Sequence, residues 1–329
     1  MKNPIARDAL RVAGGVSGAL RLFLLVALLG LLAGSVESFL SIRNGYALLQ
    51  SFALLGLVTL GLALTMLVGQ FDLSVGSMVA VGGLITIKVG GSDHLMWGIA
   101  AALAFAVLVG SINALLFSRL KLSSLVITVG TMIALSGFAY WLAAGKVIST
   151  ENFELGEVLD DPIAGLLSVR SIITFTAFAM AAGLISFTRL GRDIIATGSR
   201  LAAAEVCGVS TTAVYLFVFV TSSACAALAG GLLSISLATA SATMGSNILL
   251  QAASAAIIGG VALSGGIGSF GGVLVGVLLL TTVNNGLSLI GANTASILLI
   301  NGAVLFTVVV CDGRAGQKLK EVWASRATA

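Results

Sequence analysis

The sequence predicts an all-α membrane protein whose helices cross the bilayer about ten times. Of its 329 residues, 58% are hydrophobic and only 9% are charged, and the mean hydropathy is +1.12. A soluble domain of this size does not have so apolar a composition. The 41 glycines and only two prolines are typical of membrane helices that pack closely through small residues.

The same composition argues against several other classes of protein. The net charge of +4 is small and comes from loops and chain ends, so a nucleic-acid partner has no support. The three cysteines show no metal-ligand spacing, and His94 is the only histidine, so we expect no metal site. The phosphate-binding sequence Gly-x-x-x-x-Gly-Lys-Ser/Thr is absent, so we expect no bound nucleotide or other cofactor.

The first apolar run covers residues 22–33 and follows a basic start at residues 1–20. It can be a signal peptide with Ala33-Gly34-Ser35 as the cleavage site, or an uncleaved first span. We favour the span, because apolar residues continue beyond the small residues. The basic start predicts a cytoplasmic N-terminus.

Residues 46–87 form one apolar tract that is too long for a single crossing. At 1.5 Å per residue it is roughly twice as long as a hydrocarbon core of about 30 Å requires. The only charge inside it is Asp72, so we place a turn at residues 69–72. Asp72 is of the residue type that can cap the helix that follows.

The rest of the chain divides into seven further spans. An acidic loop at residues 146–168, either solvated or a docking surface, is expected outside, and the arginine-rich loop 188–213 and the tail 312–329 inside. The whole chain, 1–329, is then one transmembrane domain. The expected spans are residues 94–117, 122–144, 171–187, 214–237, 248–263, a ninth ending near 289, and 296–311.

The loop at 188–213 contains a short helix, which we expect to run from Arg200 to Cys207. Ser199 is a good N-cap, and Gly208 can end the helix in a left-handed conformation. About two turns of helix are unstable alone, so this helix needs a surface to pack on. It is either a connector lying on its own bundle or a docking helix for a partner protein.

A glycine-rich turn at residues 265–276 can be interpreted as a phosphate cradle or as a packing motif. We favour packing, because Gly268, Gly272 and Gly276 have the small-xxx-small spacing of close helix contacts.

Three separated motifs resemble the membrane subunits of ribose-type ABC sugar importers, and the resemblance covers residues 20–312. Departures from the family pattern are Gln70, Arg200, Ile267 and the absence of proline before residue 127. The matching residues are Gly69 and Asp72 to Gly76; Gly191-Arg192, Ala196, Gly198, Ala203-Ala204 and Gly208-Val209; and Gly265, Gly268-Ser269, Gly272, Gly276 and Asn284 to Leu287.

The resemblance implies a permease subunit in a bacterial inner membrane, without enzymatic activity of its own. It implies that ATP is bound and hydrolysed by a partner ATPase, that a second permease subunit completes the pathway, and that a soluble binding protein delivers a ribose-like monosaccharide. The alternatives are a secondary carrier or facilitator and, less favoured, a membrane enzyme. The residues that the resemblance assigns to coupling with the ATPase are Gly191, Arg192, Gly198, Arg200, Ala203, Ala204, Glu205 and Gly208.

Uncharged polar residues within the apolar spans are candidates for the solute path or for bonds between helices. Aligning Asn113 with Asn284 gives a faint internal repeat in spans of opposite direction, as in many transporters. The six candidates are Asn113, Thr128, Gln251, Asn284, Asn285 and Asn301.

Overall fold

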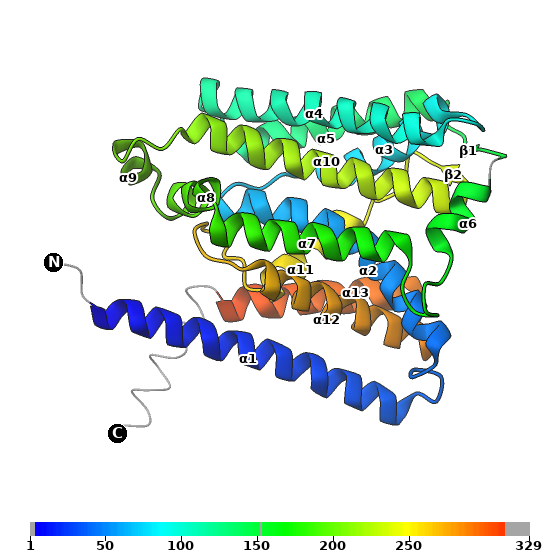
Figure 1. The fold of residues 1–329 in the computed structure, drawn as a ribbon, viewed down its shortest axis with the longest axis horizontal. Coiled ribbons are helices and arrows are strands. Elements are labelled where there is room, and N and C mark those ends of the chain that lie inside the picture. The colour runs from blue at the N-terminus through cyan, green and yellow to red at the C-terminus, as the bar shows by residue number, and fades with distance from the viewer. Residues whose placement is uncertain (1–3, 152, 313–329) are drawn as a thin grey trace.

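The computed structural model describes residues 4–151 and 153–312, with side chains for residue 19 and residues 21–151 and 153–306. In this part of the chain the fold is all-α, as predicted, with thirteen helices and one pair of two-residue strands (Figure 1). The helices are α1 (Pro4–Ser35), α2 (Ile42–Leu67), α3 (Val75–Gly90), α4 (Leu95–Leu120), α5 (Ser124–Ala143), α6 (Glu154–Asp160), α7 (Val169–Phe187), α8 (Arg189–Ser199), α9 (Leu201–Val206), α10 (Thr211–Leu237), α11 (Ile248–Ile258), α12 (Phe270–Leu289) and α13 (Thr294–Asp312).

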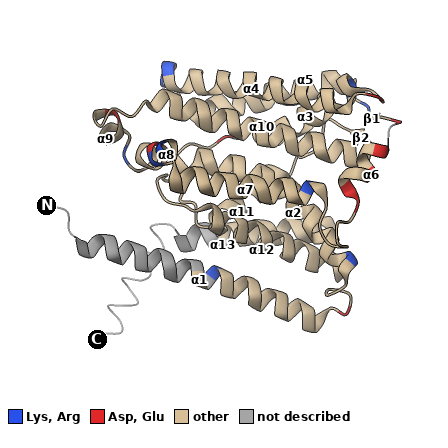
Figure 2. Ribbon diagram, in the orientation of Figure 1, with Lys and Arg blue, Asp and Glu red and all other residues tan. Residues whose placement is uncertain are grey.

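The described helices have the lengths and composition of membrane spans. Six of them, α2, α4, α5, α7, α10 and α12, are long and apolar enough to cross a bilayer, and α3, α11 and the described parts of α1 and α13 are shorter apolar helices. Most charged residues lie at the two ends of the bundle (Figure 2). The basic side chains at the two chain termini, from which we predicted that both are cytoplasmic, lie outside the described side chains.

The long apolar tract breaks where the sequence predicts. Helix α2 ends at Leu67 and α3 begins at Val75, with Gly69 in a left-handed conformation (φ +71) between them. The span expected at 248–263 ends earlier, because α11 stops at Ile258 and Gly260 turns the chain with φ +85.

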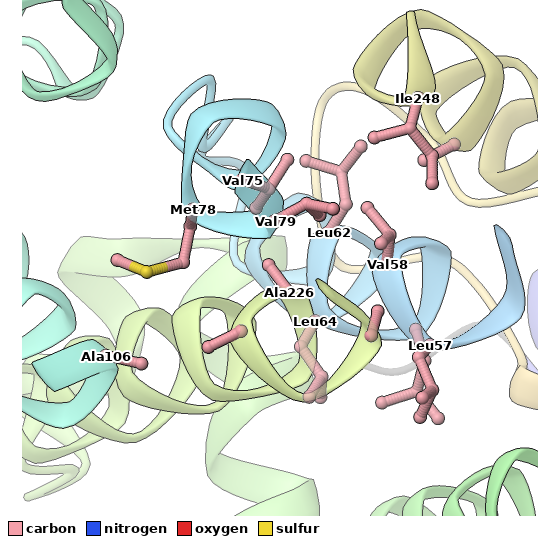
Figure 3. Close-up of a cluster of buried hydrophobic side chains, with 14 of the residues drawn as sticks. Leu57, Val58, Leu62, Leu64, Val75, Met78, Val79, Ala106, Ala226 and Ile248 are labelled. Carbon is pink, nitrogen blue, oxygen red and sulfur yellow. The ribbon is translucent and has the colours of Figure 1, made fainter. Parts of the chain in front are cut away.

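The centre of the core is made by α2, α3 and α10. One buried apolar cluster contains Leu57, Val58 and Leu62 of α2, Val75, Met78 and Val79 of α3, Ala226 of α10 and Ile248 of α11 (Figure 3). Helix α2 is almost completely buried from Phe52 to Leu67, so it is apolar on every face.

Small residues let these helices approach closely. A Cβ atom added to Gly230 of α10 would lie 1.9 Å from the carbonyl oxygen of Val79 in α3. A Cβ on Gly272 or Gly276 would lie 2.3 Å from the oxygen of Gly259 or 2.2 Å from that of Ala255. The glycine-rich segment therefore places α12 directly against α11, and we interpret it as a packing motif.

The two ends of the bundle carry different elements. Helices α8 and α9 lie at one end, and α6 lies at the other with the strand pair β1 (Ile148–Ser149) and β2 (Thr239–Ala240) (Figure 1).

Candidate coupling site and solute path

The segment expected to hold one short helix holds two. Thr188 caps α8 by accepting a hydrogen bond from the Gly191 N–H at 3.1 Å, and α8 continues to Ser199. The prediction of Ser199 as the N-cap of the short helix was wrong, because Ser199 is the last residue of α8 and Arg200 is the N-cap of α9. Ile194, which has no exposed surface, anchors α8 in the bundle. Arg200 is extended (φ −163, ψ 96) and separates α8 from α9.

Helix α9 ends as the sequence predicts. Gly208 has φ +81, and the N–H of Val209 donates to the Ala204 carbonyl at 3.0 Å. This is the bonding pattern of a glycine-terminated helix in a Schellman motif.

Two neighbouring alanines of α9, Ala203 and Ala204, face in different directions. Ala204 is only 3% exposed and packs on the bundle, whereas Ala203 and its neighbours Ala202 and Glu205 are exposed. Val206 is 89% exposed. Arg192 and Arg200 are exposed as well. The exposed surface of α9 therefore includes Ala203 and Val206 with flanking charges, whereas Ala204 is buried.

Three turns from distant parts of the chain meet at the end of α8. A Cβ on Gly198 would lie 1.9 Å from the Leu67 carbonyl oxygen and 2.6 Å from the Gly266 nitrogen. The Gly266 N–H donates to the same Leu67 oxygen at 2.8 Å. A Cβ on Gly265 would lie 2.6 Å from the Gly69 nitrogen. We call this backbone contact of residues 67–69, 198–199 and 265–266 the three-turn junction.

Asp72 lies three residues after the junction segment 67–69 and is hydrogen-bonded to α10. Its Oδ1 accepts from the Ser74 N–H at 3.0 Å and the Ser74 hydroxyl at 2.5 Å, and its Oδ2 accepts from Ser222 at 2.9 Å. The expectation that Asp72 is the N-cap was wrong in position, because Ser74 is the N-cap of α3 and makes no side-chain capping bond. Gly76 lies one turn further on, against the Gly245 carbonyl and Leu249.

Two of the six path candidates surround this Asp72 turn. Asn113 of α4 donates to Ser74 at 3.3 Å and accepts from Thr131 at 2.6 Å. Thr128 of α5 lies 3.2 Å from the Phe71 carbonyl. Both side chains are fully buried and hydrogen-bonded, so they join α4 and α5 to the start of α3.

The other four candidates lie on α11, α12 and α13. Asn285 exchanges two hydrogen bonds with Asn44, at 2.8 and 3.0 Å. Within the described residues, the Asn284 Oδ1 and both polar atoms of Asn301 are buried without a hydrogen-bond partner. Gln251 is half-buried on α11. The structure therefore does not gather the six side chains into one cavity.

Sequence reasoning missed a polar cluster at the opposite end of the bundle. Asp160, Arg170, Gln50 and Ser236 converge there from four helices. From the sequence the acidic loop is either solvated or a docking surface, and only Arg170 at the start of the next helix suggests a partner for its carboxylates within the chain.

Comparison with known proteins covers most of the chain. The family described as branched-chain amino acid transport system / permease component matches residues 45–309. The ribose import permease protein RbsC of Escherichia coli K12 is 28% identical over 303 residues, which cover 89% of this chain and 92% of that protein. No solved structure matches the chain.

Two other relatives are similarly close over similar lengths. The L-arabinose transport system permease protein AraH of Escherichia coli K12 is 32% identical over 293 residues, covering 87% of each chain. The autoinducer 2 import system permease protein LsrC of Yersinia pestis (strain Pestoides F) is 31% identical over 299 residues, which cover 90% of this chain and 83% of that protein.

Permease subunits of this family are non-catalytic and carry no cofactor, and their importers work with an ATPase and a substrate-binding protein. The apolar helices and the match over residues 45–309 both fit such a subunit. The chain therefore belongs to the permease components of the branched-chain amino acid transport family, as a multi-pass inner-membrane subunit of an ABC importer.

Proposed function

We propose that this chain forms the membrane pathway for a small polyhydroxylated solute, a ribose-like monosaccharide, whose import is driven by a separate ATPase. The observation that carries the proposal is the similarity over nearly the whole chain to permeases named for ribose and arabinose. The uncharged amides and hydroxyls within the spans agree with it, because such groups can bond sugar hydroxyls without requiring a charge on the solute.

The test of this proposal is uptake by vesicles that contain the purified permease and ATPase, with the binding protein and labelled ribose or arabinose outside. We expect uptake that needs both the binding protein and ATP inside. Uptake of the same sugar without ATP would instead identify the alternative, a secondary carrier or facilitator.

We also propose ten membrane spans arranged as an inverted repeat of α2–α5 and α10–α13. Helix α3 packs on α10, α4 and α5, and α11 makes the equivalent contacts with α2, α12 and α13. In this pairing α4 corresponds to α12, which agrees with the alignment of Asn113 with Asn284. The end that carries α8 and α9 is then the cytoplasmic end, and the end that carries α6 is the outer end.

The sidedness can be tested with two single cysteines. Ser199 and Glu157 are both exposed and lie at opposite ends of the bundle. We expect an impermeant thiol reagent added to intact cells to label Glu157→Cys but not Ser199→Cys, which should react only after the membrane is permeabilised. Labelling of Ser199→Cys in intact cells would contradict the topology.

By the same resemblance we propose that two permease subunits form the pathway. Helix α5 supports this, because Gly130 and Gly137 have no atoms within 4 Å of an added Cβ, and Val126 and Ile133 are 69% and 64% exposed. Such a face can pack closely on another helix in the membrane.

Asn284 and Asn301 are the path candidates that have buried side-chain polar atoms without a hydrogen-bond partner among the described residues. Replacing either with leucine should slow sugar uptake, because a group able to bond the solute is lost, while co-purification with the ATPase stays normal. Asn285→Leu is the matched control: it removes the bonds to Asn44, so we expect lower thermal stability instead. Unchanged uptake in both Asn284→Leu and Asn301→Leu would assign them a structural role.

A further inference from the structure

Helix α6 is fastened to three other helices through its last residue, Asp160. Arg170 of α7 donates to Asp160 Oδ1 from Nε at 2.7 Å and from Nη2 at 2.6 Å, and Gln50 of α2 donates to the same oxygen at 3.1 Å. Ser236 of α10 donates to Oδ2, and Tyr46 of α2 donates to the backbone oxygen of Asp160. We call this set of five residues the Asp160 clasp.

Both charges of the clasp stand at the unfavourable ends of their own helices. Arg170 lies in the first turn of α7, and Asp160 is the last residue of α6, so each helix dipole opposes its charge. Arg170 therefore depends on Asp160 for its charge partner, and Asp160 is held by Arg170, Gln50 and Ser236. The Asp160 side chain is 28% exposed, so water can hydrate the carboxylate when the pair separates, but the Arg170 side chain is only 9% exposed. Separation of the pair therefore requires that Arg170 also reaches water, which happens only if the helices on either side of it move apart.

Helix α6 is tied most closely to α10. A Cβ on Gly156 would lie 2.8 Å from the Ile235 carbonyl oxygen. The strand β1, just before α6, pairs with β2, just after α10, through Ser149 opposite Thr239 and Ile148 opposite Ala240. Helix α6 and the outer end of α10 therefore form one body, and Arg170, Gln50 and Tyr46 join it to a second body made by α2 and α7.

Below the clasp, a space of about 10 Å³, enough for about one water molecule, lies between the two bodies. A small crevice there has Arg170 at its wall and is otherwise apolar, with lining residues Ala53, Leu54 and Leu57 of α2 and Ala229, Leu232 and Leu233 of α10. Nearer the cytoplasmic end the same two helices touch backbone to backbone, because a Cβ on Gly61 would lie 2.9 Å from the Ser222 Cα. Helices α2 and α10 are thus in backbone contact at their crossing, and side chains of both helices line the crevice toward the clasp.

We propose that the Asp160 clasp is an outer closure of this permease, which opens by separation of the α6–α10 body from the α2–α7 body about the Gly61–Ser222 crossing. The inference rests on the proposed function, since only a transport subunit needs an outer closure that opens and closes. Asp160 and Arg170 are positioning residues in this account: they hold two groups of helices together and touch no solute.

The first test measures access to the crevice and does not depend on transport. In a cysteine-free background, Leu57→Cys, which replaces a side chain only 2% exposed, is labelled with an impermeant thiol reagent from outside. Adding Asp160→Asn should speed the labelling several-fold, and Asp160→Glu should restore most of the protection. Cysteine at Ala226, a fully buried core position, should stay unreactive throughout. Equal labelling of Leu57→Cys with and without Asp160→Asn would overturn the proposal, as would an equal increase at Ala226→Cys.

The second test locks the closure during transport. The pair Gln50→Cys and Asp160→Cys spans the two bodies, and the pair Ser149→Cys and Thr239→Cys lies within one body. Linking the first pair with a short reversible bis-thiol reagent should abolish ATP-driven uptake until the link is reduced, whereas linking the second should leave uptake intact. Uptake at the unlinked rate with the first pair linked would overturn the proposal. If the cysteine-free parent lacks ATP-driven uptake, the proposed function has failed, and the crevice labelling still decides on the clasp.

Discussion

Replacing Gly198 with alanine is expected to abolish or severely reduce ATP-driven uptake and to lower the thermal stability of the permease. The added methyl group would lie 1.9 Å from the Leu67 carbonyl oxygen and 2.6 Å from the Gly266 nitrogen, closer than real atoms approach. Both neighbours are backbone atoms, so no side chain can rotate away, and the turns themselves must shift. Overpacking of this kind typically costs about 1–3 kcal/mol. Uptake and the melting temperature in detergent are the measurements.

Gly183→Ala is the matched control for Gly198→Ala. Gly183 also lies inside a helix, α7, but no atom lies within 4 Å of its added Cβ. There the change should be neutral or slightly stabilising, by up to about 1 kcal/mol, because alanine favours helix over glycine. Normal stability and normal uptake in Gly198→Ala would show that the three-turn junction can relax, and that it is not the contact through which α8 acts.

The second large effect is expected from a charge on α9. Ala203→Glu should leave normal amounts of permease in the membrane but remove the ATPase from the purified complex and stop ATP-driven uptake. Ala203 is exposed, so the fold tolerates the new side chain. A groove of the ATPase that receives this helix would be overfilled and would bury an unpaired charge, at a cost of several kcal/mol. Co-purification of the ATPase, compared with membrane abundance, is the measurement.

Ala204→Glu separates docking from folding in the same helix. Ala204 is 3% exposed and packs on the permease itself, so this variant should lose stability and membrane abundance. We therefore expect Ala203→Glu to fail in ATPase binding with normal folding, and Ala204→Glu to fail in folding. If Ala203→Glu co-purifies fully with the ATPase and supports full uptake, α9 does not form the docking surface.

The positions of the membrane helices could be predicted because water and lipid impose them. The charge at Asp72 interrupts an apolar tract far longer than one span, and the break between α2 and α3 falls there. Helix α8 was missed because Arg189, Arg192 and Asp193 suggest an irregular polar loop. Two features of the sequence indicate this helix. Thr188 is a residue type that can cap a helix by accepting from the N–H three residues later, and Ile194 is an apolar residue that can anchor the helix.

The contacts at the candidate sites could not be predicted in the same way. Asn113 and Thr131 bond each other from different spans, and no spacing in the sequence fixes how two spans are rotated. The pairing of Asp160 with Arg170 was hidden for another reason: a carboxylate in an acidic loop looks solvated until the loop is known to fold back over the bundle. The resemblance identified three motifs but did not indicate that they contact one another in the fold.

The three-turn junction also determines how such permeases can be recombined. Residues 67–69, 198–199 and 265–266 contact one another through backbone atoms, so the shape of each turn is fitted to the other two. A chimera that receives only the α8–α9 segment of a relative would place that relative's residues 198–199 against this chain's own residues 67–69 and 265–266, to which they are not fitted. Exchange of all three segments together would keep the fit. The unit that can be transplanted between such permeases without disturbing this fit is therefore discontinuous in sequence, although it is a single contact in the folded chain.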